Sequence, residues 1–270
     1  MIRAKRINNM IVTPPPSLDQ KDPRPVRGRE LFEEPYANVF IASRKKSGKT
    51  YTIYNILKKC VGKNTTVIFF CSTLYKDPVY KSIMGMLDKN KINYIGYTSL
   101  VEDGIDHLQE LVECLTKEAE HQFMEDQMPK DKLRKMLFGD DEDDEKKPRK
   151  LKYLAPDYIM VLDDLSDELK SRSLVTLLKK NRHFLCKILI STQNWNDILP
   201  ESRKQIDYVL VFKNMVEKKL IEIYRDCNVA ITFEQFKKIY DWATQPTYSF
   251  MYVDCMNDTF RRNFNIAIEL

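Results

Sequence analysis

The chain has 270 residues, 43% of them hydrophobic, which suffices to bury the core of one domain with additions. Its net charge of +5, from 44 basic and 39 acidic side chains, permits a nucleic-acid partner without requiring one. No apolar stretch approaches the roughly 18 residues of a membrane span, no apolar core follows the N-terminal charges, and the six cysteines are scattered, which argues against a membrane protein, a secreted protein and a zinc or disulfide framework.

Prolines are frequent among the charges at the start of the chain, at positions 14, 15, 16, 23, 25 and 35. Because proline blocks helices and interior strands, we predict an extended basic arm over residues 1–34 and one domain over residues 35–270. The arm is either a disordered leader or a segment that grips nucleic acid or a neighbouring subunit.

The first predicted strand, residues 39–42, leads into a phosphate-binding loop that is followed by a helix through Lys59. The loop matches the pattern G-x-x-x-x-G-K-T except that serine replaces the first glycine. Its predicted nucleotide-binding residues are Ser43, Arg44, Lys45, Lys46, Ser47, Gly48, Lys49 and Thr50.

Such a loop cradles phosphates with backbone N–H groups at a helix N-terminus. Lys49 should reach the β- and γ-phosphates of a nucleoside triphosphate, and the Thr50 hydroxyl should bind Mg²⁺. The position of Ser43 often requires backbone conformations that glycine reaches easily. Ser43 therefore either strains the loop or bends it differently, and the nucleotide affinity is left open.

Strand and helix signals alternate along the rest of the chain. Apolar, β-branched runs predict strands over 65–71, 92–97, 158–162, 187–191 and 208–212, and helical spacing predicts a helix over 108–121. Residues 139–150 are an acidic block followed by a basic one and predict a solvated loop insertion. Residues 249–253 and 264–268 suggest a closing hairpin. This alternation predicts an α/β fold with a largely parallel sheet covered by helices on both faces.

The strand at 158–162 ends in two acids, Asp163 and Asp164. A buried strand that ends in a carboxylate is the second half of many phosphate-loop sites, where the carboxylate helps to hold Mg²⁺. Asp163 fits that metal role, and Asp164 stands where ring-forming ATPases place the acid that polarises the attacking water. Alternatively, both acids cap a helix that begins near Ser166.

Two further residues flank the strand at 187–191. Gln193 follows its end, at the sheet edge where α/β proteins bind ligands, and an amide there can sense the γ-phosphate. Arg182 precedes the strand. It is either a surface salt-bridge partner or an arginine offered to a neighbouring subunit's nucleotide.

The motifs taken together resemble the poxvirus-type genome-packaging ATPases of the FtsK/HerA branch of P-loop motors, over roughly residues 36–212. The resemblance rests on the loop at 43–50, on Val161-Leu162-Asp163-Asp164, on Asn181-Arg182-His183, and on Gln193 followed by a proline and Arg203. It implies a RecA/FtsK-like P-loop NTPase fold. It also implies catalytic roles for Asp164, for Gln193 as sensor and for Arg182 as a trans-acting finger, with Arg203 as a second candidate.

The resemblance further implies an ATPase that uses ATP and Mg²⁺ to move double-stranded DNA, independently of its sequence, into a preformed viral capsid. We would then expect a ring of identical subunits without membrane contact, in the cytoplasm of an infected cell or in the virion. Two alternatives remain open at this point: a P-loop kinase of small molecules, and a degenerate P-loop scaffold that binds DNA or a capsid.

Overall fold

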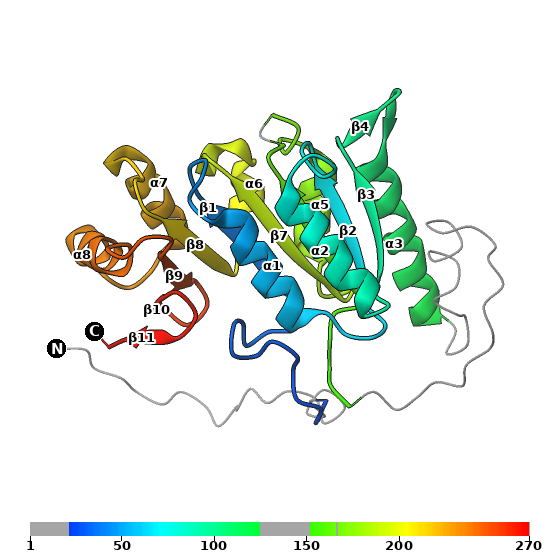
Figure 1. Ribbon diagram of the computed structural model, residues 1–270, viewed down its shortest axis with the longest axis horizontal. Coiled ribbons are helices and arrows are strands. Elements are labelled where there is room, and N and C mark those ends of the chain that lie inside the picture. Colours follow the sequence, from blue (N-terminus) through cyan, green and yellow to red (C-terminus); the bar gives the residue numbers. More distant parts are fainter. Residues whose placement is uncertain (1–21, 125–151, 166, 270) are drawn as a thin grey trace, which may run out of the picture.

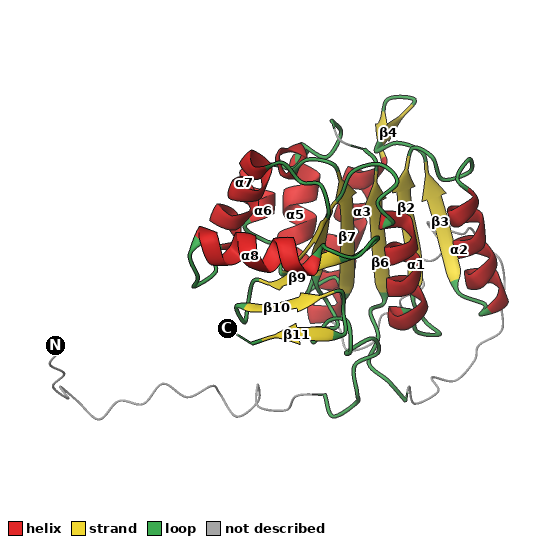
Figure 2. Cartoon of the chain, turned by 60° about the vertical axis from the view of Figure 1, so that its left-hand side comes forward, coloured by secondary structure: helices red, strands yellow, loops and turns green. Residues whose placement is uncertain are grey.

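A computed structural model describes residues 22–124, 152–165 and 167–269, and it describes residues 121–124 by their backbone alone. The first 21 residues of the predicted arm, the predicted loop insertion at 139–150 and Ser166 lie outside the described residues. Within these ranges one sheet of nine strands forms the centre of the molecule (Figures 1 and 2).

Six parallel strands make up most of this sheet, in the spatial order β8-β1-β7-β6-β2-β3. They are β1 (Asn38–Ala42), β2 (Thr66–Cys71), β3 (Asn93–Tyr97), β6 (Tyr158–Asp163), β7 (Cys186–Thr192) and β8 (Tyr208–Phe212). Every residue of β1, β2, β7 and β8 is buried, as expected for strands covered on both faces. The six predicted parallel strands are confirmed.

Three antiparallel strands extend the sheet beyond β8: β9 (Phe250–Asp254), β10 (Thr259–Arg262) and β11 (Ile266–Ile268). The predicted pairing of residues 249–253 with 264–268 was wrong, because β10 lies between them and pairs with both. The sequence of β10, Thr-Phe-Arg-Arg, contains one apolar residue, and only Phe260 is buried. A strand with one core-facing side chain shows too little alternation to be recognised.

Helices cover both faces of the sheet, as predicted. On one face α1 (Lys49–Cys60) and α2 (Pro78–Lys89) share a hydrophobic core with Val39 and Ile41 of β1. On the other face α3 (His107–Met124), α5 (Arg172–Lys180), α7 (Glu217–Cys227) and α8 (Phe233–Ala243) share a second core with Phe40. Successive residues of a strand point to opposite faces, so β1 contributes to both cores.

Shorter elements complete the described chain: the hairpin of β4 (Val101–Glu102) and β5 (Ile105–Asp106), the single turn η2 (Trp195–Asp197), and α6 (Pro200–Arg203). None of the described helices is long and apolar enough to cross a bilayer.

The described part of the predicted arm packs on the domain (Figure 1). Val26 forms a parallel bridge to Leu154, and Phe32 is 1% exposed. The Phe32 ring lies 5.1 Å from that of Tyr208 and 5.6 Å from that of Phe264. The predicted boundary at residue 34 therefore falls inside a packed segment, because Phe32 completes an aromatic cluster of the core.

Candidate nucleotide-binding site

The predicted site residues gather at the carboxyl edge of the sheet, where the parallel strands end. The loop joins β1 to the N-terminus of α1, and the Ser43 N–H donates to the Thr192 carbonyl at the end of β7 (3.0 Å). The Asp164 N–H, just after β6, donates to the Ser191 carbonyl (3.2 Å). Sheet hydrogen bonding thus places the loop, the double acid and the end of β7 side by side.

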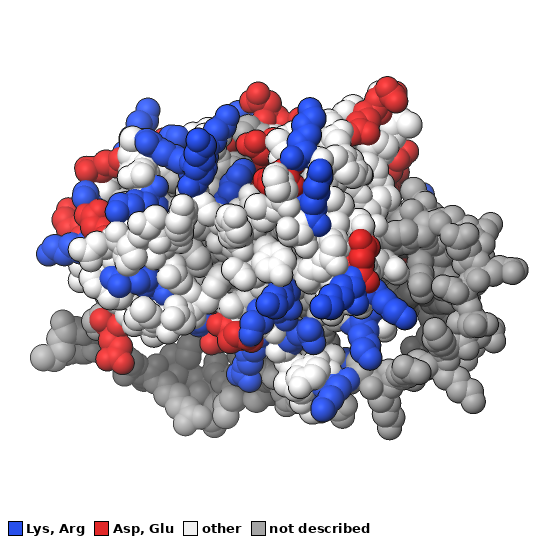
Figure 3. Space-filling view, viewed as in Figure 1, with Lys and Arg blue, Asp and Glu red and all other residues white. Residues whose placement is uncertain are grey.

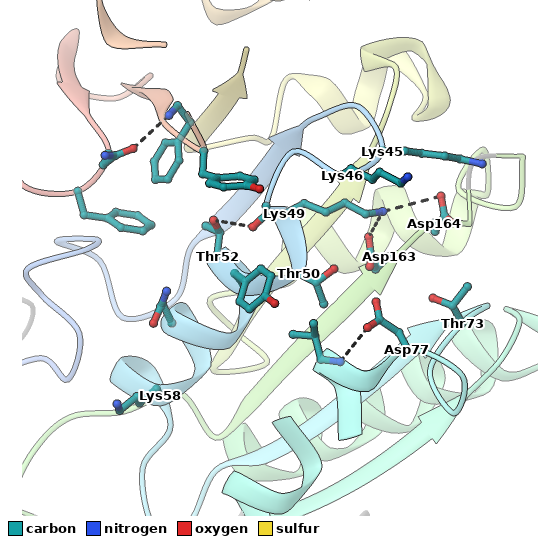
Figure 4. Close-up of a pocket in the computed structure, with 18 of the residues that line it drawn as sticks. Lys45, Lys46, Lys49, Thr50, Thr52, Lys58, Thr73, Asp77, Asp163 and Asp164 are labelled. Carbon is teal, nitrogen blue, oxygen red and sulfur yellow. Dashed lines mark hydrogen bonds and ion pairs between the residues drawn. The ribbon is translucent and has the colours of Figure 1, made fainter. Parts of the chain in front are cut away.

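Lys49 contacts both acids (Figure 4). Its Nζ donates to Asp163 Oδ1 at 2.8 Å and lies 3.8 Å from Asp164 Oδ1. Burial by itself lowers the pKa of Lys49, but the two carboxylates outweigh that effect and the pKa is raised. Lys49 is therefore a cation held at the point where the loop meets the double acid.

Tyr80, on α2, is a residue of this site that the sequence analysis missed. Its buried hydroxyl donates to Asp163 Oδ2 at 2.9 Å. Burial and the Asp163 charge raise the pKa of Tyr80 well above its usual value, so the hydroxyl keeps its proton. Both carboxylate oxygens of Asp163 are thus engaged, one by Lys49 and one by Tyr80, and the carboxylate is fixed in orientation.

The loop adopts a left-handed backbone at Lys46 (φ 62°) and at Gly48 (φ 99°), whereas Ser43 does not have a positive φ. Ser43 is fully buried and continues β1 by its bond to Thr192. The backbone at this position therefore does not require glycine. The hydroxyls of Ser43 and Ser47 are buried without a partner among the described residues, and neither serine lines the cavity at the loop.

A cavity of about 1410 Å³ opens at the loop. Charged and hydroxyl side chains line the end near β6, and Figure 4 shows how they lie: Lys45, Lys46, Lys49, Thr50, Thr73, Asp77, Asp163 and Asp164. Mg²⁺ prefers oxygen ligands, commonly one or two carboxylates together with phosphates and water. The Asp163 carboxylate and the Thr50 hydroxyl are oxygen donors of this kind, so the residues fit the metal that the sequence predicted.

The double acid does not cap a helix in the described structure. The helix that follows, α5, begins at Arg172, and its first turn is capped by Ser171, whose Oγ accepts from the Leu174 N–H (3.1 Å). Asp164 instead has a left-handed backbone (φ 59°), which is uncommon for a non-glycine residue and is often found at functional sites.

Five of the predicted site residues do not line the cavity: Ser43, Arg44, Ser47, Gln193 and Arg182. The end of β7 brings Gln193 to the correct edge, but its side chain does not line the cavity, and its carbonyl accepts from Lys219 Nζ (3.5 Å). Arg44 is exposed beside the lining residues. Arg182 precedes β7 and therefore lies at the opposite, amino edge of the sheet, 61% exposed and 4.0 Å from Asp207.

Arg203, the second candidate for a finger, is engaged within its own chain. Its Nε donates to the Ile198 carbonyl at 3.1 Å, and its Nη1 lies 3.4 Å from Asp226 at the end of α7. These contacts hold the segment that connects β7 to β8.

Comparison with known proteins supports the fold. No protein-family model matches the chain. A curated relative, Uncharacterized protein 075L of Invertebrate iridescent virus 6, is 32% identical over 102 residues, which are 36% of this chain and 38% of that protein. The match thus spans little more than a third of that relative's length.

Solved structures match much more of the chain. The genome packaging NTPase B204 of Sulfolobus turreted icosahedral virus 2, in complex with AMP, is 20% identical with a TM-score of 0.54, and the match covers 85% of this chain and 98% of that one. Its complex with ATP-gammaS gives a TM-score of 0.53 over the same shares. B204 of Sulfolobus Turreted Icosahedral Virus, described as a DNA-packaging ATPase, is 18% identical with a TM-score of 0.53 over 85% and 97%. At this identity the likeness shows a shared fold, and the predicted P-loop NTPase fold is confirmed.

Proposed function

We propose that this chain is an ATP-hydrolysing motor that moves double-stranded DNA into a preformed viral capsid. The observation that carries the proposal is the convergence of Lys49, Thr50, Asp163 and Asp164, from two distant parts of the sequence, on one cavity at the loop. The extent of the fold likeness to a genome packaging NTPase, 85% of this chain, supports the motor over other P-loop functions.

In this proposal each residue has a role at the nucleotide. Lys49 and the loop N–H groups bind the phosphates of ATP, and Thr50 and Asp163 hold Mg²⁺. The metal, when bound, neutralises phosphate charge during transfer. Asp164 accepts a hydrogen bond from the attacking water and polarises it. Gln193 follows β7 at the same edge of the sheet and is the proposed γ-phosphate sensor, although its side chain does not line the cavity.

Arg182 has a role in the proposal only between subunits. Because it lies at the amino edge of the sheet, it is remote from its own chain's loop. In a ring of identical subunits it would reach the nucleotide of a neighbour and stabilise charge there. The ring itself is part of the proposal.

The DNA contact in this proposal is electrostatic. Exposed basic residues follow β1 and β8 at the carboxyl edge of the sheet: Arg44, Lys45, Lys46, Lys213 and Lys218. Figure 3 shows lysine and arginine side chains gathered at the upper left of the molecule, toward α7. Contacts of this kind bind phosphates without reading the sequence and weaken as salt rises. The capsid and the cytoplasm of an infected cell are the proposed partner and setting.

The test is ATP hydrolysis by the full chain, with and without double-stranded DNA, beside Lys49→Ala. We expect DNA to stimulate hydrolysis by the wild type and Lys49→Ala to lose at least about 100-fold of the rate, because the phosphate charge loses its cation. ATP consumption that is unaffected by DNA but stimulated by a nucleoside, with the phosphoryl group transferred to that nucleoside, would indicate a kinase instead. Absence of hydrolysis in the wild type, with DNA binding retained, would indicate a scaffold.

A further inference from the structure

The cavity is larger than a phosphate site requires, and its far end has a different chemistry. At about 1410 Å³ it exceeds the roughly 300–1,000 Å³ of most ligand pockets. Away from the double acid it runs between two walls. One wall is the face of α1 that carries Tyr51, Asn55 and Lys58, and the other is the C-terminal part of the sheet.

The spacing of the α1 residues shows that the first wall is one continuous face. Positions 51, 55 and 58 differ by four and three, so their side chains lie one above the other along the helix. This face starts at the N-terminus of α1, directly after Lys49 and Thr50, and leads away from the phosphate end. The cavity along this face therefore has room for the remaining part of a ligand whose phosphates are bound at the loop.

The second wall places an exposed aromatic ring at the loop. Tyr248 is 68% exposed and has a left-handed backbone (φ 61°), which is rare for a bulky residue. A Cβ added to Gly48 would lie 3.3 Å from Tyr248 Cδ1, so the ring packs against the second glycine position of the loop. Most of this large ring stays in solvent at the mouth of the cavity, on a strained backbone, so its contact with Gly48 does not by itself explain its position.

The turn that carries Tyr248 is held in place by its neighbours. The Asn263 Oδ1 accepts from the Phe250 N–H (3.1 Å), and Lys213 Nζ donates to the Gln245 carbonyl (2.9 Å). The Ser249 N–H donates to the Pro246 carbonyl (3.3 Å). The ring is thus presented to the cavity by a fixed turn.

We propose that Tyr248 stacks on the base of the bound nucleotide, whose opposite side faces Tyr51 and Asn55 of α1. This inference rests on the proposed function, since it requires a nucleotide on the loop. It assigns stacking on the base to Tyr248, which lies outside the part of the chain that carries the family motifs. Stacking tolerates any base, because every base has a π-face.

The experiment compares two ligands, ATP and inorganic tripolyphosphate, by calorimetric titration of the full chain. Tyr248→Ala should weaken ATP binding about 10-fold and leave tripolyphosphate binding within about twofold, because only ATP has a base. The Tyr248→Phe variant should bind ATP with the affinity of the wild type, because the ring and not the hydroxyl stacks on the base. Tyr75→Ala is the matched control: Tyr75 is 57% exposed and lies outside the cavity lining, so both ligands should bind as to the wild type.

The outcomes separate this inference from the proposed function. If Tyr248→Ala weakens both ligands equally, Tyr248 supports the loop through Gly48 and the stacking role is wrong. If it weakens neither, the base lies elsewhere and the stacking role is also wrong. If the wild type binds neither ligand, the proposed function fails together with the inference.

Discussion

A lysine lies at each edge of the central sheet, Lys49 partly buried and Lys187 fully buried, and the two differ in what surrounds them. At the carboxyl edge, Lys49 Nζ contacts the carboxylates of Asp163 and Asp164, and its pKa is raised. At the amino edge, Lys187 Nζ donates to the Glu34 carbonyl (2.9 Å), and burial lowers its pKa. Nearby carboxylates raise the pKa of a lysine, and burial without them lowers it. The direction of the pKa shift therefore depends on the neighbours of each lysine and not on the edge of the sheet at which it lies.

The difference separates a ligand site from a packing site. Lys49 lies in an open cavity, where an incoming phosphate can replace its carboxylate partners. Lys187 is 1% exposed, and its Nζ lies 4.9 Å from the centre of the Phe32 ring, so it fixes the N-terminal segment on the sheet. We therefore expect substitutions at the carboxyl edge to change activity, and substitutions at the amino edge to change stability.

The largest expected effect is that of Asp163→Asn at the carboxyl edge. The amide removes a negative charge from Lys49 and from the proposed metal, so ATP hydrolysis should fall about 100-fold or more. The matched control is Asp254→Asn at the amino edge, where Oδ1 accepts from the Met256 N–H (3.0 Å) and an amide oxygen can do the same. Steady-state rates of ATP hydrolysis are measured on samples of both variants with the same folded content. An equal loss of activity in the two variants would contradict the expected difference between the two edges.

Tyr80→Phe should have the next largest effect. It removes the hydroxyl that orients Asp163 but leaves the carboxylate in place. Residues that orient a metal ligand typically contribute about 10- to 100-fold to metal affinity or activity. We expect the Mg²⁺ concentration for half-maximal hydrolysis to rise about 10-fold, with a smaller fall in kcat at saturating Mg²⁺. An unchanged Mg²⁺ dependence would show that Tyr80 only fills the core.

Lys187→Met should have a smaller effect, and on stability alone. Methionine replaces a buried cation that has no carboxylate in hydrogen-bond contact, so the free energy of unfolding at neutral pH should rise by about 1 kcal/mol. Urea unfolding followed by circular dichroism measures this change, and ATP hydrolysis should stay within about twofold of the wild type. A loss of several kcal/mol would mean that the bond to Glu34 outweighs the burial of the charge.

The smallest expected effect is a difference in pH dependence between the two lysines. As pH rises toward the unfolded lysine pKa of about 10.4, Lys187 loses its proton first in the folded protein. The unfolded state then holds more protons, so the stability of the wild type relative to Lys187→Met should increase with pH. The pKa of Lys49 is raised in the folded protein. Its contribution to the free energy of unfolding is therefore fully present below the unfolded lysine pKa and is lost as the pH rises through the folded pKa. Relative to Lys49→Met, stability should therefore stay constant between pH of about 7.5 and about 9.5.

Much of the fold and part of the site were predictable because their signals are local. The buried strands are continuous apolar runs, and the loop at 43–50 and the double acid after β6 are short motifs in fixed strand and helix settings. Where the local signal is weak or misleading, the prediction from the sequence failed. The strand β10 has a single buried residue, and Phe32 follows a proline-rich stretch that otherwise predicts an extended arm.

Ser43 shows that a sequence motif does not by itself predict the backbone conformation of each of its positions. The pattern expects glycine there, and the sequence alone left open a strained loop or a different bend. The structure places the left-handed residues at Lys46 and Gly48, so serine fits the position without a positive φ.

The sequence by itself determined where the six parallel strands lie along the chain, their alternation with helices and the residues that follow their ends, because apolar runs and turn-forming residues act over a few positions. Only the tertiary structure decided which distant groups meet: Tyr80 at Asp163, Tyr248 at Gly48 and Phe32 at Tyr208. The physical reason is that periodicity records which face of its own element a side chain occupies. It does not record which element packs against that face.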